Sequence, residues 1–191
     1  MLGRCLVQLF GAVTFVFLFS LAAVAQTSEY PITVGGFVGT IDLRGPVGEK
    51  PLGFGGRVSY DFNDNFALDG EAAYFPQNPS GNFGQTVALA GVKAGFRTKN
   101  VGVFAKARPG VVRFGGDFFK AYNGQGQNHF AVDVGGVVEF YPSKRVVVRV
   151  DVGDTIIPFG QDTVRGPLPP FVTRPGTTHN LQASIGAGFR F

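Results

Sequence analysis

Apolar and polar residues alternate along most of the chain, which is the pattern of a β-strand with two different faces. Between residues 145 and 156, four valines occupy successive even positions, while Arg149 and Asp151 lie at odd positions. The same alternation occurs in segments 54–62, 66–74, 129–141 and 181–191. It is less regular in segments 33–43, 86–97 and 101–114. The pattern predicts eight strands.

The predicted strands are long, and the connections between them alternate in length. Each segment has roughly 10 to 14 residues, whereas strands of soluble proteins average about 5 to 6 and a tilted membrane-spanning strand needs about 9 to 11. Tight polar turns are expected at residues 63–65, 98–100 and 142–144. Longer loops rich in Gly and Pro are expected at 44–50, 76–85, 115–128 and 157–178. Short turns at one end and long loops at the other are typical of outer-membrane barrels.

The two faces of the strands distinguish between two all-β folds. A soluble β-sandwich, the alternative, has an apolar inner face and a polar outer face. Here one face is apolar and the other carries charges of both signs, which suits a lumen when the apolar face meets lipid. We therefore expect an all-β, eight-stranded antiparallel up-and-down transmembrane β-barrel with a structural or gating network of charges inside. The expected lumen residues are Asp42, Arg57, Asp61, Asp69, Glu71, Lys93, Arg97, Lys106, Arg108, Asp133, Glu139, Arg145, Arg149, Asp151 and Arg190.

The N-terminal segment 1–25 has the three parts of a secretory signal peptide. Arg4 provides a positive charge, an apolar stretch follows, and Ala23-Val24-Ala25 supplies small residues for cleavage. An uncleaved membrane anchor is the alternative, because the apolar stretch is about 20 residues long and could span a bilayer. Cleavage would leave residues 26–191 as one outer-membrane barrel domain without cysteine, since Cys5 lies in the removed segment.

Composition and charge argue against nucleic-acid binding and indicate what fills the lumen of this barrel. The net charge is only +4, and Lys and Arg are scattered singly, so nucleic-acid binding is not expected. The expected lumen residues comprise eight cations and seven anions. Because an eight-stranded barrel is just wide enough to be filled by its own side chains, we expect these charges to pair and plug the lumen. A narrow polar pore, in which the pairs exchange partners, is the alternative.

Patterns for catalysis and metal binding are scarce. Alternation places His129 inward and His179 outward, so the two histidines are not expected to share a site. Acyl transfer needs a nucleophile held beside a base. His129 is followed by Phe130 and Ala131 rather than by the His-x-Ser arrangement of a barrel lipid A deacylase. We expect no catalytic residue, no metal and no cofactor.

The end of the chain and one hairpin resemble a known family. The last strand, Ile185–Phe191, is rich in Gly and Phe, and Val58–Leu68 forms a hairpin sequence. Both are similar to the outer-membrane β-barrel family of OmpA-like transmembrane domains, over about residues 30–191. The resemblance implies that Phe189 and Phe191 belong to the signal by which the barrel-assembly machinery selects its clients. The periplasmic peptidoglycan-binding domain of full-length OmpA is expected to be absent, so a cell-wall tether is not implied.

These features predict an integral protein of the bacterial outer membrane with a structural or surface-contact role. The alternatives are a narrow porin-like channel for small solutes and an adhesin whose surface loops bind ligands. Segment 115–128 offers aromatic and polar side chains for such contacts, and segment 158–178 carries Arg165 and Arg174, which could meet lipid phosphates. We expect outer-membrane lipid and lipopolysaccharide as partners, and a monomer.

Overall fold

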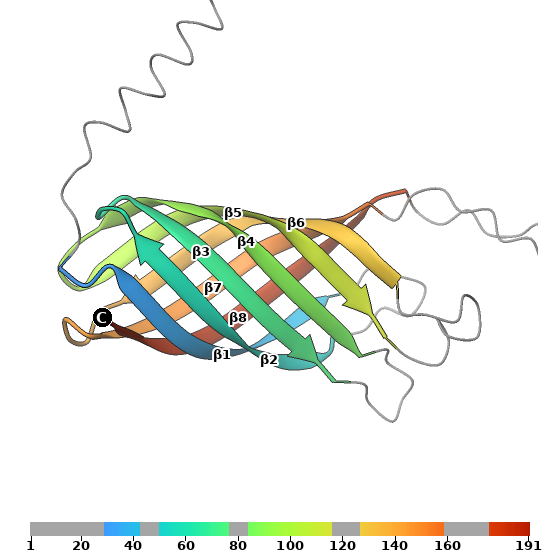
Figure 1. The fold of residues 1–191 in the computed structure, drawn as a ribbon, viewed down its shortest axis with the longest axis horizontal. Helices are drawn as coiled ribbons and strands as arrows, with labels where there is room; N and C mark the ends of the chain where they lie inside the picture. The colour runs from blue at the N-terminus through green and yellow to red at the C-terminus, as the bar shows by residue number, and fades with distance from the viewer. Residues whose placement is uncertain (1–28, 43–49, 77–83, 116–126, 159–175) are drawn as a thin grey trace, which may run out of the picture.

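Eight strands close into a barrel. The structure, a computed structural model, describes residues 29–42, 50–76, 84–115, 127–158 and 176–191. In these ranges lie β1 (Ile32–Asp42), β2 (Leu52–Asp61), β3 (Phe66–Phe75), β4 (Gln85–Arg97), β5 (Val101–Phe114), β6 (Gln127–Phe140), β7 (Val146–Ile157) and β8 (Thr178–Arg190). Each strand pairs antiparallel with the next, and β8 pairs with β1 (Figure 1). The predicted all-β, eight-stranded antiparallel up-and-down barrel is confirmed.

Some predictions fall outside this description. The expected signal peptide, residues 1–25, lies outside the described residues, as do most of the four expected long loops. No helix in the described ranges is long and apolar enough to cross a membrane.

The three tight turns are each stabilised by a short polar side chain near their start. The Asn63 side-chain oxygen accepts hydrogen bonds from the backbone N–H groups of Asn65 and Phe66, at 2.7 and 2.9 Å. The Thr98 hydroxyl donates to the carbonyl of Val101 at 2.8 Å, and the Ser143 hydroxyl accepts from the N–H of Val146 at 3.2 Å. Asn, Ser and Thr favour turns because their side chains bond to nearby backbone groups. The predicted turns at 63–65, 98–100 and 142–144 thus have a local cause.

The register of the strands sets the tilt of the barrel. A path that starts at Ile32 and crosses one partner on each strand returns to β1 at Asp42, ten residues farther along. The residues on this path are Ile32, Tyr60, Leu68, Val92, Ala107, Val134, Asp154, Leu181 and Asp42. With eight strands and ordinary β-sheet spacings, this stagger corresponds to a tilt of about 40° from the barrel axis.

Glycines on the inner wall allow the strands to approach closely. A Cβ added to the inward Gly55 would overlap the carbonyl oxygen of Ala72 and the ring of Phe37. The adjacent Gly56 faces outward, and the nearest atom to its added Cβ, the Gly35 oxygen, is 3.9 Å away. The inner wall therefore requires glycine at Gly55, whereas the outer wall would accept a methyl group at Gly56.

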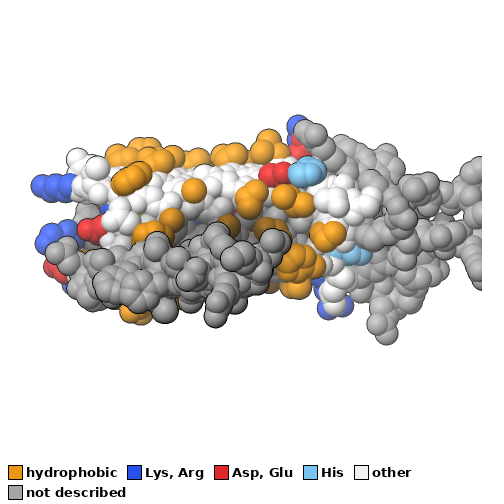
Figure 2. All heavy atoms as spheres, turned by 90° about the horizontal axis from the view of Figure 1, so that it is seen from above, with side chains coloured by type: hydrophobic (Ala, Val, Ile, Leu, Met, Phe, Trp, Pro, Cys, Tyr) orange, Lys and Arg blue, Asp and Glu red, His pale blue; other side chains and the backbone are white. Residues whose placement is uncertain are grey.

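Large apolar side chains are exposed on the outer face of every strand, and many are visible on the face of the barrel shown in Figure 2. Six exposed phenylalanines follow the turn end of the barrel: Phe62, Phe66, Phe96, Phe140, Phe189 and Phe191. An apolar belt of this extent is not stable in water, since soluble monomers rarely expose apolar patches of more than a few hundred Å². A belt edged by aromatic residues is the outer surface of a barrel embedded in lipid.

Candidate functional site

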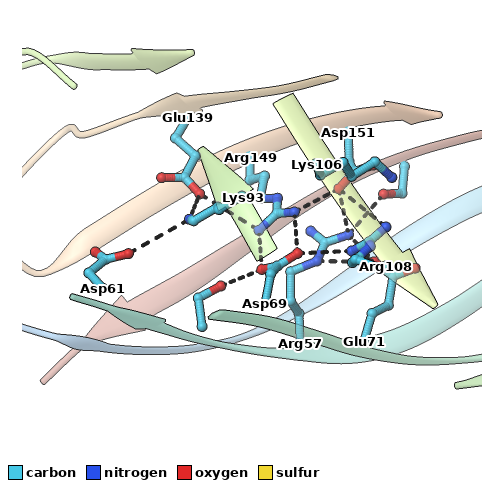
Figure 3. A network of polar contacts seen from close by, with 12 residues as sticks. Arg57, Asp61, Asp69, Glu71, Lys93, Lys106, Arg108, Glu139, Arg149 and Asp151 are labelled. Atoms are coloured by element: carbon cyan, nitrogen blue, oxygen red, sulfur yellow. Dashed lines mark hydrogen bonds and ion pairs between the residues drawn. The ribbon is translucent and has the colours of Figure 1, made fainter. Parts of the chain in front are cut away.

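Charged side chains gather inside the barrel in its turn-side half. The structure places thirteen of the fifteen expected residues in the lumen: Arg57, Asp61, Asp69, Glu71, Lys93, Arg97, Lys106, Arg108, Asp133, Glu139, Arg149, Asp151 and Arg190. Ion pairs join these seven cations and six anions into one network, which we call the ionic lattice. Figure 3 shows its central part.

Two of the expected residues lie elsewhere, and their placement in the lumen was wrong. Asp42 faces outward, where its carboxylate lies 3.3 Å from the ammonium group of the exposed Lys50. Ile41, not Asp42, is the inward residue at the end of β1. Arg145 precedes the first residue of β7 and is exposed, with its guanidinium 5.5 Å from the ring of Tyr30. Arg145 has the inward position by alternation, but alternation does not show that β7 begins one residue later, at Val146.

Arg108 lies at the centre of the ionic lattice and is fully buried. Its Nη1 atom donates to Asp69 at 3.0 Å and to Glu71 at 2.9 Å. Its Nη2 atom donates to Asp133 at 2.5 Å. Three carboxylates from β3 and β6 therefore converge on one guanidinium from β5, the fork-shaped cation best suited to several planar acceptors.

Arg149 connects opposite walls of the barrel. It extends from β7 and donates to both carboxylate oxygens of Asp69 on β3, at 2.7 and 2.8 Å. It also donates to Asp151 on its own strand at 2.8 Å. Because β3 and β7 are four strands apart in a ring of eight, this two-pronged pair spans the whole lumen.

Arg57 and Lys106 complete the middle of the ionic lattice. Arg57 donates to Glu71 at 2.5 Å and lies 3.4 Å from Asp151. Lys106 contacts Asp133 at 2.5 Å and also pairs with Asp151. Each of these carboxylates is shared by at least two cations. A buried ion without a partner costs several kcal/mol. Because each carboxylate pairs with more than one cation, the ion pairs compensate this cost.

A second cluster closes the turn end of the lumen. The Asp61 carboxylate forms an ion pair with Arg97 at 2.8 Å and accepts a hydrogen bond from Arg190 at 3.3 Å. Just beyond the end of β6, the Tyr141 hydroxyl accepts from Arg97 at 2.8 Å and donates to Glu139 at 2.6 Å. Burial and the Glu139 carboxylate raise the pKa of Tyr141, so its phenol stays protonated and can donate this bond.

Buried apolar side chains gather in the loop-side half of the lumen, beside buried polar residues of β4, β7 and β8, and the sequence did not predict this apolar cluster. Its buried side chains, which we call the apolar septum, are Phe37, Ile41, Ala73, Phe75, Val87, Leu89, Val112, Phe114, Ala131 and Ile157. They face inward, opposite to neighbours such as Tyr74 and Val111 that face lipid. Where both faces are apolar, alternation disappears, and this loss is the signal that could have revealed the septum.

The two histidines lie on different faces, as expected from alternation. His179 is exposed on the outside of β8, where its Nδ1 atom lies 2.6 Å from Asp154 on β7. His129 packs its ring against Phe114, with centroids 5.8 Å apart. Among the described residues, no group of three His, Cys, Asp or Glu side chains is placed to hold a metal ion.

Comparison with known proteins identifies the family. The family model described as "Outer membrane protein beta-barrel domain" matches residues 11–191. The fold is similar to the N-terminal β-barrel domain of Pseudomonas aeruginosa OprF, with a TM-score of 0.54, 12% identity, and coverage of 85% of this chain and 98% of that one. Neisserial surface protein A gives a TM-score of 0.53 at 17% identity, covering 84% of this chain and 97% of that one.

A third similar structure is Ail, the attachment invasion locus protein of Yersinia pestis. Its TM-score is 0.51 at 18% identity, and the match covers 87% of this chain and all of that one. At these identities the likeness concerns the fold alone. No curated protein matches the chain in sequence. Because the family model spans nearly the whole chain and the lipid-facing belt agrees with it, the chain belongs to the outer membrane protein β-barrel family and resides in the bacterial outer membrane.

Proposed function

We propose that this protein is a structural component of the outer membrane whose lumen is closed to solutes and whose contacts are made at its surface. The observation that carries the proposal is that side chains occupy the lumen at two levels, the thirteen charged residues of the ionic lattice toward the turns and the apolar septum toward the long connections. The buried ions pair with one another, so they do not need hydrated solutes as partners. The alternative of a narrow porin-like channel requires these bonds to break.

The closed lumen is tested by planar-bilayer recording of the refolded protein. We expect no steady conductance, because side chains from opposite walls, such as Arg149 and Asp69, meet in the lumen. Steady ion-dependent conductance of the unaltered protein would overturn the closed lumen and favour the channel. Loss of that conductance in a Glu71→Gln/Arg108→Met variant would show that ions pass through the lattice rather than around the barrel.

A surface-binding role is the second candidate, and the arrangement of connections favours it. Turns of a few residues join the strands at one end, while the four long connections all leave from the other. In outer-membrane barrels the long connections face outside the cell. Ail, whose fold is similar, is named an attachment protein. Deleting residues 116–126, which leaves β5 and β6 intact, should reduce adhesion of cells that display the protein; unchanged adhesion would count against this role.

The exposed aromatic end of the chain supports a proposal about assembly. The rings of Phe189 and Phe191 lie 5.1 Å apart, and both are exposed on the outside of the barrel. They are accessible to the barrel-assembly machinery and then to lipid. Deleting Phe191 should lower the amount of heat-modifiable, membrane-inserted protein. Normal insertion of this variant would show that the terminal ring is not part of the signal.

A further inference from the structure

We propose that the apolar septum, and not the ionic lattice, is the barrier that stops ions in the lumen. This inference rests on the proposed closed lumen and says which part of it provides the closure. The two zones lie in series along the axis, the lattice toward the turns and the septum toward the long connections. An ion must cross both, so the zone with the higher barrier determines permeation.

The septum closes the cross-section because large rings occupy the space left by glycines. Six strands contribute apolar side chains to it, and β2 and β8 contribute none. On β2 an added Cβ at Gly53 would overlap the ring of Phe75, and one at Gly55 would overlap the ring of Phe37. The two rings therefore lie directly on the β2 backbone. The two rings thus occupy the space that side chains on β2 would otherwise take.

The polar residues beside the septum do not offer ions a path. On β7 and β8, the Thr155 hydroxyl donates to Gln182 at 3.0 Å, and the Asn180 amide donates to the Thr155 carbonyl at 2.8 Å. The Gln182 amide donates to Glu71 at 2.8 Å. All three side chains are buried and already engaged. A passing ion would have to displace these bonds. On β4, the side-chain oxygen of the buried Gln85 has no hydrogen-bond partner among the described residues, and the apolar side chains beside it, Phe75 and Phe114, supply no ligand.

The lattice, by contrast, can accept water and ions. A cavity of about 20 Å³ lies beside Arg57, Ser59, Glu139 and Arg149, which is room for one water molecule. Water in the cavity would meet the charged side chains of Arg57, Glu139 and Arg149. Carboxylates shared between cations can also exchange partners, so the lattice can rearrange without losing all of its bonds.

Apolar constrictions block ions by excluding water, even where the gap would fit an ion. The septum side chains are at most 6% exposed, so an ion there would lose its hydration without replacement. Moving an unpaired ion into such surroundings is far more costly than moving it among paired charges. The barrier is therefore expected where the lumen is dry.

The experiment compares two septum variants with two controls in planar bilayers. Val87→Thr/Val112→Thr adds hydroxyls at nearly constant volume, and Phe75→Ala/Phe114→Ala removes two rings. The lattice control is Lys106→Met/Asp151→Met, which removes one ion of each sign and leaves the septum intact. The outer control is Val111→Thr, a lipid-facing neighbour of Val112. Folding of each variant is checked by its heat-dependent migration on a detergent gel.

We expect channel openings in both septum variants to be at least about tenfold more frequent than in the unaltered protein, since wetting removes the barrier. Both controls should remain closed. Silent septum variants, or openings in the lattice control, would overturn the assignment of the barrier. Conductance of the unaltered protein would instead contradict the closed lumen itself, so the two failures are distinguishable.

A second measurement needs no variant and covers the case in which the septum variants do not fold. Nuclear magnetic resonance of the detergent-refolded protein detects magnetisation transfer from water to nearby protons. We expect transfer to the guanidinium groups of Arg57 and Arg149 and none to the methyl groups of Ile41, Leu89 and Val112. Transfer to these methyl groups would show a wet septum and overturn the inference.

Discussion

The two halves of the lumen are built on the same eight strands but are held together by different forces. In the turn-side half, Arg108 forms ion pairs with the carboxylates of Asp69, Glu71 and Asp133, which other cations share. In the loop-side half, side chains such as Phe75 and Val87 fill space without forming directional bonds. One barrel interior is therefore specified by paired charges in its turn-side half and by the shape of apolar side chains in its loop-side half.

This difference predicts different responses to substitution. A lattice of buried charges is sensitive to the removal of one partner, because the others remain buried and uncompensated. An apolar septum is sensitive to volume, because a removed side chain leaves a cavity or a collapsed wall. The four predictions below test this contrast through the free energy of unfolding, measured by urea titration of the protein in lipid vesicles.

The largest effect is expected for Arg108→Met. The substitution removes the cation shared by Asp69, Glu71 and Asp133, and we expect unfolding free energy to fall by about 4 kcal/mol. Arg113→Met is the matched control, since Arg113 lies on the same strand but is exposed, and its effect should stay within about 0.5 kcal/mol. Equal effects of the two substitutions would mean that the lattice does not stabilise the fold.

Phe75→Ala should have the next largest effect. The ring is 1% exposed and packs in the septum, so its loss is expected to cost about 3 kcal/mol. The neighbouring Tyr74 faces lipid, and Tyr74→Ala should cost only about 1 kcal/mol because lipid fills the space that the ring leaves. A larger loss for Tyr74→Ala would contradict the inward packing of Phe75.

Gly55→Ala should show that the inner wall has no space for a methyl group. The added Cβ would overlap the Ala72 oxygen and the Phe37 ring, and we expect a loss of about 2 kcal/mol from overpacking. Gly56→Ala, on the outer face, should change the free energy by no more than about 0.5 kcal/mol. If both variants unfold alike, the inner wall is more adaptable than the close approach indicates.

The smallest effect is expected for Asp42→Asn. Within the described part of the chain, Asp42 pairs with the exposed Lys50 on the outside of the barrel, and exposed ion pairs contribute at most about 1 kcal/mol. The matched change in the lattice, Asp69→Asn, breaks the pairs with Arg108 and Arg149 and should cost several times more. Similar costs would place Asp42 in the lumen after all.

Much of the fold follows from local patterns in the sequence. Alternation identifies the strands, and the turn residues Asn63, Thr98 and Ser143 mark three connections because their side chains bond within the turn. Which charges meet which could not be predicted, because the partners depend on the register and stagger of all eight strands. Arg149 and Asp69 are 80 residues apart in sequence.

The misplacement of Asp42 and the failure to predict the septum have one physical cause. Where both faces of a strand are apolar, polarity does not show which alternate residues face inward. The irregular segments 33–43, 86–97 and 101–114 supply six of the septum residues: Phe37, Ile41, Val87, Leu89, Val112 and Phe114. Both faces are apolar there, one against lipid and one against the septum. Asp42 was misplaced in the first of these segments, where Ile41 takes the inward position.

The bond between Arg149 and Asp69 has a mechanical consequence. A closed sheet of eight strands is a thin-walled tube, and the crowded acyl chains of a membrane squeeze it from the side. Such a tube yields most easily by flattening into an ellipse, which shortens one diameter and lengthens the other. The two-pronged pair joins β7 to β3 along a diameter at 2.7 and 2.8 Å. This pair resists both shortening and lengthening of that diameter, so it opposes flattening of the barrel without a thicker wall.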